Sequence, residues 1–181
     1  MQKNNVIAVS GTPGTGKSDF AQYLVKELGA KLISLDEIIE ESGAYELDPD
    51  GTRVVDPEDL CEDIKRVIAR EDRPVLIDGL LSHLLPTEMI SQVVVLRTNP
   101  EVLEKRLRKR GYSEKKLQDN LEAEALGIIL WEAVYKHGID KVYEIDTTQK
   151  TTSDAVNVLK KALEGEKSLK PGEIDWLEEF F

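Results

Sequence analysis

The feature that most constrains the fold is a glycine-rich turn between an apolar run and an amphipathic segment. Residues 11–18 read Gly-Thr-Pro-Gly-Thr-Gly-Lys-Ser, which matches the phosphate-binding pattern G-x-x-x-x-G-K-[ST]. Residues 5–10 are a short apolar run bounded by polar residues, which suits a buried parallel strand. The segment after the turn places its apolar residues on one helical face and ends near Gly29. Strand, loop and helix in this order predict a phosphate site in an α/β fold.

Each part of the loop has a chemical role. Its glycines lack a Cβ, so successive backbone amides can turn inward around a polyphosphate. Lys17 is placed to reach the outer phosphates as a point charge, and the Ser18 hydroxyl is placed to ligate the Mg²⁺ of a nucleoside triphosphate. We therefore expect nucleotide contacts from the loop residues Gly11, Gly14, Thr15, Gly16, Lys17 and Ser18.

Length and composition favour one intracellular domain. The chain has 181 residues, of which 40% are hydrophobic and 33% charged, and this fits a single domain over residues 1–181. The longest apolar stretches are far too short to span a bilayer, and no secretory signal precedes the loop. The single cysteine, Cys61, cannot form an internal disulfide, and no Cys/His cluster has zinc spacing.

Charge is unevenly distributed along the chain. The net charge is −11, yet residues 97–116 hold eight basic residues and three acids. An acidic body argues against broad nucleic-acid binding, whereas a concentrated basic patch favours a local polyanion such as nucleotide phosphates. The alternative is a solvated helical face balanced by pairs such as Glu104 with Arg108. We favour the phosphate role, because the loop already implies such a ligand.

Strand and helix signals alternate along the rest of the chain, which indicates a parallel sheet covered on both faces. An irregular insert occupies residues 43–56, and a Thr151-x-x-Asp154 signature caps the last long helix. The predicted fold is therefore a three-layer P-loop NTPase fold with a five-stranded parallel sheet, of the nucleoside monophosphate kinase type. Its strands are expected at 5–10, 31–35, 74–78, 92–96 and 141–145, and helices at 57–70, 100–109 and 114–136.

Charged residues stand where the carboxyl ends of the strands would lie, the edge at which such sheets bind ligands. Asp78 ends an apolar strand and is the expected second Mg²⁺ anchor opposite Ser18; the alternative is a turn cap. Asp36 and Glu37 either position a second substrate or simply begin a helix as first-turn acids.

Three arginines, Arg97, Arg106 and Arg110, are candidates to neutralise charge on a transferred phosphoryl group, and Arg97 is also a candidate substrate-binding residue. Arg110 is the best placed, because it precedes Gly111 at the junction of two predicted helices, where a hinge could swing it over the ligand. Arg106 either shares that helical face or makes only a surface pair. His83 and His137 are expected to be structural or surface residues, although His83 follows Asp78 closely enough to remain a candidate. Trp131, Leu117, Leu121 and Ile128 are expected in the core.

The chain resembles the adenylate-kinase-like proteins represented in eukaryotes by adenylate kinase isoenzyme six, which also have archaeal relatives. The resemblance covers nearly the whole sequence and rests on the loop 11–18 and on Val95-Leu-Arg-Thr98. Its most specific part is Arg106-Leu-Arg-Lys-Arg-Gly-Tyr-Ser-Glu-Lys-Lys-Leu-Gln-Asp-Asn120, followed by Glu122 and Glu124.

This resemblance implies a monophosphate-binding segment at about 34–57, a mobile lid at about 109–119 and a C-terminal tail at 165–181. It implies ATP and Mg²⁺ as cofactors and reversible phosphoryl transfer from ATP to AMP or a related monophosphate. The family is also associated with ATPase activity. Implied ATP contacts are Gly14, Gly16, Lys17, Ser18, Asp19 and Arg110, with Lys150 near the base.

The sequence departs from the family at two places. Members often carry an Asp-x-His pair at the third strand, but here Asp78-Gly79 is followed by Leu80, and the arginine that ordinary adenylate kinases place after Asp-Gly is also missing. Slow monophosphate turnover is the expected result. Asp19 stands where threonine is common and adds a negative charge near the phosphates.

Two hypotheses follow for the function. The first is a small nucleoside monophosphate kinase, cytoplasmic, or nuclear in a eukaryote. The second is an ATP-hydrolysing assembly factor for late maturation of the small ribosomal subunit, with a platform ribosomal protein as partner, as the family resemblance implies. The tail 172–181 carries spaced apolar residues that either bind a partner or, as we favour, dock on the protein's own body.

Overall fold

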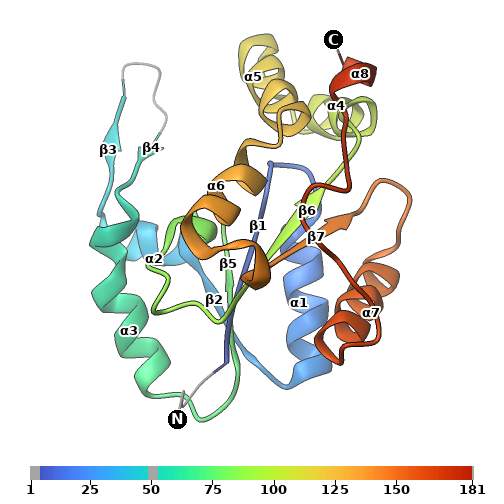
Figure 1. Ribbon diagram of the computed structural model, residues 1–181. Coiled ribbons are helices and arrows are strands. Elements are labelled where there is room, and N and C mark those ends of the chain that lie inside the picture. The colour runs from blue at the N-terminus through green and yellow to red at the C-terminus, as the bar shows by residue number, and fades with distance from the viewer. Residues whose placement is uncertain (1–4, 49–52, 181) are drawn as a thin grey trace.

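The computed structural model describes residues 5–48 and 53–180. Its centre is a five-stranded parallel sheet in the order β2-β5-β1-β6-β7 (Figure 1). The strands are β1 Val6–Gly11, β2 Lys31–Ser34, β5 Val75–Asp78, β6 Gln92–Arg97 and β7 Val142–Asp146. All four pairings are parallel, so the expected three-layer fold with a five-stranded parallel sheet is confirmed.

Helices cover both faces of this sheet, as Figure 1 shows. The main helices are α1 Lys17–Leu28, α2 Leu35–Ser42, α3 Cys61–Ala69, α4 Pro100–Lys109, α5 Glu114–Ala125, α6 Ile128–His137 and α7 Thr152–Leu163. Alternate residues of β1 point to opposite faces: Val6 and Ala8 pack with α2, α3 and α6, whereas Ile7 and Val9 pack with α1 and α7. The central strand is thus buried on both sides, and its carboxyl end opens toward α4 and α5.

The predicted helix over 114–136 is wrong in one respect, because it is interrupted at Leu126 and Gly127. Helix α5 ends at Ala125, Gly127 takes the left-handed conformation with φ of 63°, and α6 begins at Ile128. The predicted core positions beyond the break are also wrong, since Ile128 is 40% exposed and Trp131 is 64% exposed. The face of α6 that carries Ile128 and Trp131 is exposed, while Leu130 and Ala133 pack in the core. Leu117 and Leu121, by contrast, are buried as expected.

Two further segments differ from the prediction: the insert contains regular structure, and the helix predicted from Pro57 begins with a different kind of turn. The insert at 43–56 contains a small antiparallel pair, β3 Glu46–Leu47 with β4 Arg53–Val54, while residues 49–52 lie outside the described chain. The helix predicted from Pro57 begins as a 3-10 turn at Pro57–Leu60 before α3. Short 3-10 turns also occur at Ser82–Leu84 and Ile139–Lys141.

The C-terminal tail lies across the body of the protein. It forms only one short helix, α8 Leu177–Phe180, which sits over α4 in Figure 1. Phe180 packs against a cluster that α4 and α5 build from Leu103, Leu107, Leu117 and Leu121. Backbone amides of Gly172 and Glu173 donate to Glu144 of β7, at 2.8 and 3.1 Å. The tail therefore docks on the protein itself, as favoured; the predicted apolar position at residue 181 lies outside the described residues.

Within the described residues, we find no helix that is both long and apolar enough to cross a membrane.

Candidate active site

The glycine-rich loop connects the end of β1 to the start of α1. Gly14 and Gly16 have φ of 93° and 92°, a conformation that residues with a Cβ rarely adopt. A Cβ on Gly14 would also approach Leu103 Cδ1 to 2.8 Å, so α4 packs directly on the loop. Gly16 precedes α1 without a side chain to cap it. The first amides of α1, and the positive end of its dipole, are thus available to an anion.

The loop is stabilised by hydrogen bonds among its own residues. The Thr12 carbonyl accepts from the Thr15 hydroxyl at 2.9 Å and from Lys17 Nζ at 3.2 Å. Thr12 and Thr15 are 2% and 1% exposed. The Thr15 carbonyl in turn accepts from the hydroxyl of Thr147, which follows β7. The loop is therefore already folded into a cradle, with the lysine bound to a backbone oxygen.

Two carboxylates lie near the ammonium of Lys17. Burial lowers the pKa of Lys17 to about 8, and the negative charges of Asp78 and Asp36 oppose that shift. Burial raises the pKa of Asp78, against the effects of a hydrogen bond from Ser18 and the charge of Lys17. Ser34 pairs with Asp78 in the register of β2 and β5, which brings the start of α2 to this edge. Lys17, Ser18, Asp36 and Asp78 thus meet at the carboxyl end of the sheet.

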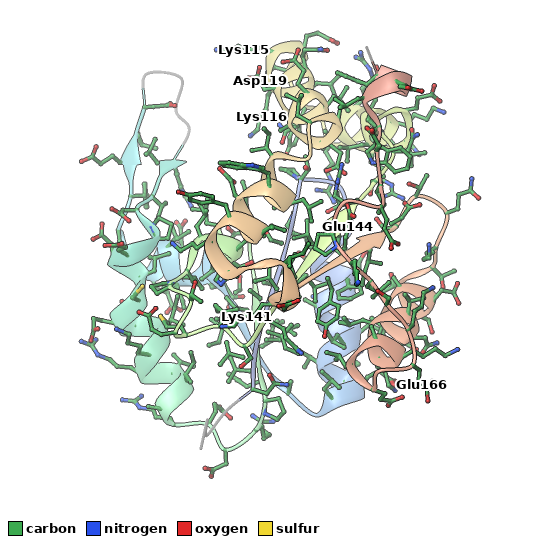
Figure 2. The ribbon with its side chains drawn as sticks, viewed as in Figure 1. Lys115, Lys116, Asp119, Lys141, Glu144 and Glu166 are labelled. Atoms are coloured by element: carbon green, nitrogen blue, oxygen red, sulfur yellow. The ribbon has the colours of Figure 1, made fainter. Side chains whose placement is uncertain are left out.

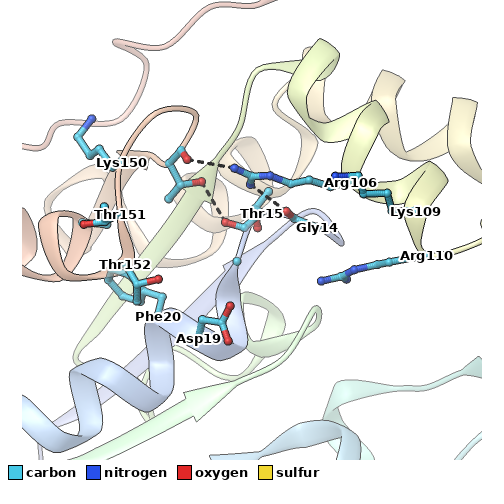
Figure 3. A pocket seen from close by; sticks show the side chains of 13 residues that line it. Gly14, Thr15, Asp19, Phe20, Arg106, Lys109, Arg110, Lys150, Thr151 and Thr152 are labelled. Atoms are coloured by element: carbon cyan, nitrogen blue, oxygen red, sulfur yellow. Dashed lines mark hydrogen bonds between the residues drawn. The ribbon is translucent and has the colours of Figure 1, made fainter.

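A cavity of about 370 Å³ lies beside the loop. Its lining comes from four segments: the loop with the start of α1, the end of α4, the turn after β7 and the start of α7. In Figure 3, Arg106, Lys109 and Arg110 lie on one side of the cavity and Lys150, Thr151 and Thr152 on the other. The structure therefore brings Gly14, Thr15, Gly16, Asp19, Arg106, Arg110 and Lys150 into one cavity.

The arginines of the basic window have different environments. Arg106 Nη1 donates to the Gly14 carbonyl at 3.1 Å, so it lies against the loop and is not restricted to a surface pair. Arg110 extends into the space in front of the loop in Figure 3. Arg108, in contrast, forms ion pairs with Glu104 at 2.8 Å and Glu114 at 2.5 Å on the exposed face. The solvated-face interpretation is confirmed for Arg108, whereas the phosphate role of Arg106 and Arg110, which line the cavity, stays a prediction.

Arg97 does not line the cavity, and its predicted role as a substrate-binding residue is corrected by its surroundings. Its side chain is 3% exposed, and it forms ion pairs with Glu124 at 2.9 Å and Glu144 at 2.7 Å. A third donation goes to the Glu124 carbonyl at 2.8 Å. This guanidinium is committed to a buried network behind the loop. Sequence reasoning missed the partners, because they lie on α5 and β7, far along the chain from β6.

Asp36 and Glu37 both lie in the first turn of α2. The Glu37 amide donates to the Ser34 hydroxyl at 3.3 Å, so Ser34 is the cap of this helix. Both acids are exposed, and of the two only Asp36 contributes to the electrostatic environment of Lys17. The helix-start interpretation therefore holds for both residues, and Asp36 in addition faces the loop region.

The two histidines are buried behind the loop. The His83 ring forms hydrogen bonds with Ser10 Oγ and Glu132 Oε2, each at 2.9 Å. Burial lowers the pKa of His83, and the hydrogen bond and charge of Glu132 oppose that shift. The His137 ring contacts the His83 carbonyl at 2.8 Å. His83 is 2% exposed and His137 6% exposed. Both are structural residues, as the first interpretation of the sequence expects.

Sequence comparison shows the family to which the chain belongs. The sequence profile of a family described as an AAA domain matches residues 7–127. A protein of Archaeoglobus fulgidus that carries the name "Putative adenylate kinase" is 42% identical, over 96% of this chain and 93% of its own length. A protein of Methanocaldococcus jannaschii with the same name is 38% identical, over 97% of this chain and 94% of its own length.

Solved structures with a similar fold are P-loop kinases. Shikimate kinase from Bacteroides thetaiotaomicron superposes with a TM-score of 0.61 at 20% identity, over 88% of this chain and 98% of that chain. Shikimate kinase from Acinetobacter baumannii gives 0.63 at 19% identity, over 92% and 96%. At such identity the likeness concerns the fold alone. With the archaeal relatives matched over nearly their whole length, the chain belongs to the adenylate-kinase-like family of nucleotide kinases.

Proposed function

We propose that this protein is a Mg²⁺-dependent adenylate kinase, which transfers the terminal phosphoryl group of ATP to AMP or a related monophosphate. The observation that carries the proposal is the partly buried Lys17 ammonium, which donates to the Thr12 carbonyl of the glycine loop and lies in the electrostatic field of Asp78 and Asp36. Phosphoryl transfer depends mainly on positioning and on neutralising charge. This edge of the sheet offers both.

The loop and α4 supply the contacts to ATP in this proposal. Backbone amides of residues 14–19 surround the phosphates, and Lys17 moves from the Thr12 carbonyl to the outer phosphates. Arg110 neutralises the charge that develops on the transferred group, while Arg106 supports the loop through the Gly14 carbonyl. The adenine base lies toward Lys150 and the start of α7, at the other side of the cavity.

The residues present fit a magnesium ion. Asp78 Oδ1 is buried without a hydrogen-bond partner among the described residues, and Ser18 lies next to the same carboxylate. Mg²⁺ prefers a few protein oxygens together with substrate phosphates. Ser18 and Asp78 would hold the ion, which would neutralise charge on the phosphates.

The second substrate enters from the side of α2. In the proposal, the segment 34–57 binds the monophosphate, with Asp36 and Glu37 at the start of α2 facing it. The proposed lid is the turn between α4 and α5, which covers the site when it closes. Gly111, with φ of 73°, supplies a hinge there. Leu80 is 41% exposed, and the resemblance implies a histidine at this position in many family members, so the proposal assigns no proton transfer to it and includes slow turnover.

ATP hydrolysis is proposed as a side reaction of the same site. Without the arginine that normally follows Asp-Gly, the monophosphate is bound less firmly, and water competes for the phosphoryl group. The assembly-factor hypothesis and its ribosomal partner stay predictions of the family resemblance. A pull-down with and without residues 165–181 that recovers no ribosomal protein would remove that hypothesis.

A panel of monophosphates tests the kinase proposal. ADP formation and phosphate release are measured with Mg-ATP alone and with AMP, CMP, GMP or UMP. We expect AMP to increase ADP formation most, and Lys17→Ala to abolish the increase. Lys26→Ala, at the far end of α1, is the matched control and should behave as wild type. A rate of ATP loss that no monophosphate changes would refute the proposal.

A further inference from the structure

A buried polar network joins the phosphate loop to α5, outside the ATP cavity. The Thr12 hydroxyl donates to Glu124 Oε2 at 2.5 Å. The other carboxylate oxygen, Oε1, accepts from Arg97 Nε and from the Thr98 amide, each at 2.9 Å. Thr12, Arg97 and Glu124 are 2%, 3% and 2% exposed. Every polar atom of the Glu124 carboxylate therefore has a protein partner.

A buried charge loses its hydration, so this network destabilises the fold unless each charged group has its hydrogen-bond and ion-pair partners. Arg97 offsets the charge of Glu124 and has a second partner in Glu144, itself hydrogen-bonded to the tail. Figure 2 shows Glu144 between β7 and the tail, whereas Lys115, Lys116 and Asp119 lie at the outer end of α5. The network thus has a fixed geometry, unlike the charges on the surface of α5.

Thr12 transmits that fixed geometry to the loop. Its hydroxyl is held by Glu124, and its carbonyl accepts from Lys17 Nζ and from the Thr15 hydroxyl. One residue therefore connects the buried carboxylate to the lysine ammonium. A rotation of the Thr12 peptide would move the acceptor of Lys17 and change the path of the glycine cradle.

We propose that Glu124 is a positioning residue, which acts through the Thr12 hydroxyl to hold the phosphate loop and Lys17 in the arrangement that accepts ATP. The inference rests on the proposed function, in which this loop binds ATP. Glu124 and Thr12 make no contact with substrate in this role. Their contribution is to prepare the cradle before the nucleotide arrives, so that binding does not have to order it.

A purely structural role for Glu124, as the charge partner of Arg97, makes a different prediction. In that role, loss of the Thr12 hydroxyl lowers stability, because Glu124 Oε2 loses its partner, but ATP binding and kcat/KM of the folded protein do not change. Thr12→Val removes the hydroxyl and keeps the shape, whereas Thr12→Ser keeps the hydroxyl and loses a methyl group. Both variants leave the contacts of Glu124 with Arg97 and Thr98 in place. Comparing them separates positioning from structural support.

The experiment measures the dissociation constant of ATP by calorimetry, and kcat and KM for ADP formation, in the full chain. A misplaced reacting group can cost on the order of 100-fold in rate. We expect Thr12→Val to weaken ATP binding and lower kcat/KM by ~10-fold or more, and Thr12→Ser to restore both. Thr87→Val, which removes a remote hydroxyl bound to the Lys136 carbonyl, is the matched control.

All variants are compared at a temperature at which near-ultraviolet circular dichroism shows each to be folded, and Thr12→Ala repeats the test if Thr12→Val is less stable. Equal ATP affinity and kcat/KM in Thr12→Val and Thr12→Ser would overturn the inference. Failure of the wild-type chain to bind ATP would instead overturn the proposed function. The two failures are therefore distinguishable.

Discussion

The floor and the wall of the candidate site are built differently. The floor is the glycine loop, in which Thr12 and Thr15 are almost fully buried and hydrogen-bonded to neighbouring segments. The wall is the turn from α4 to α5, in which residues 108–116 are exposed except for Tyr112, which is partly buried. Ion pairs on exposed faces contribute little to stability. The comparison shows that the phosphate cradle is preformed, whereas the turn that we propose as a lid has mainly exposed side chains and surface ion pairs.

The largest expected effect breaks the network beneath the floor. Glu124→Ala leaves Arg97 buried with one carboxylate partner in place of two. Removing one member of a buried ion pair typically costs about 3–5 kcal/mol, so we expect a loss of this size in the free energy of unfolding, measured by urea denaturation. Glu122→Ala, on the same helix and bonded to Gln118 on the exposed face, should change stability by less than about 0.5 kcal/mol.

Equal stability of the Glu124→Ala and Glu122→Ala variants would show that the floor does not depend on the buried network.

The second prediction concerns the wall. Arg110→Ala should lower kcat by about 100-fold or more, because in the proposed function Arg110 supplies the charge that stabilises the transferred phosphoryl group. Arg108→Ala is the matched control, since it removes a neighbouring arginine that pairs only with exposed glutamates. Neither variant should unfold the protein. Steady-state kinetics in which both arginine variants have the same kcat would contradict the assignment of Arg110.

The third prediction concerns how ATP affinity depends on pH through Lys17 of the glycine loop. The pKa of Lys17 is lowered by burial to about 8, against a usual value of 10.5. Above pH 8 the free protein loses the ammonium that ATP needs, so ATP affinity should fall by up to about 10-fold per pH unit, with proton uptake on binding. Calorimetry in buffers of different ionisation enthalpy measures that uptake. An ATP affinity that is constant between pH 7 and 9.5 would contradict the prediction.

The effect of pH on folding stability has the opposite sign to its effect on ATP affinity. The unfolded chain holds the Lys17 proton more firmly than the folded chain, so this group disfavours folding at pH 8 and below. That contribution disappears as the pH rises from about 8 to 10.5. Lys17→Met should therefore be more stable than wild type at pH 7 in urea denaturation, with a smaller difference at pH 10.

The smallest expected effect is at the tail. Phe180 packs against Leu103, Leu107, Leu117 and Leu121, which support the wall. Phe180→Ala should lower the free energy of unfolding by about 1 kcal/mol, because a partly buried ring loses its contacts. Hydrogen exchange should then be faster in the turn between α4 and α5 than in β1. Faster exchange in β1 alone would show that the tail supports the floor instead.

The sheet and the loop could be predicted because their signals are local. The glycine pattern, the apolar run before it and the helical face after it lie within 25 consecutive residues. The break at Gly127 was not predicted, because the apolar period of 114–136 continues through it, although Gly127 takes the left-handed conformation there.

The buried network of Thr12, Arg97 and Glu124 could not be predicted from the sequence for a different reason. Arg97 stands at the carboxyl end of a strand, where ligand-binding residues gather, and the sequence does not reveal to which side its chain turns. Its partners are 27 and 47 residues away. The resemblance points to Glu124 as part of a specific string, but only the structure shows that its carboxylate holds Thr12 and Arg97.

The most direct test of the central claim follows the terminal phosphoryl group itself. The protein is incubated with Mg²⁺, AMP and ATP labelled at the γ-phosphate, and the products are separated. The account predicts that label appears as the β-phosphate of ADP, that the rate saturates with AMP, and that Lys17→Ala abolishes it. Label that appears only as free phosphate, at a rate that AMP does not change, would contradict it.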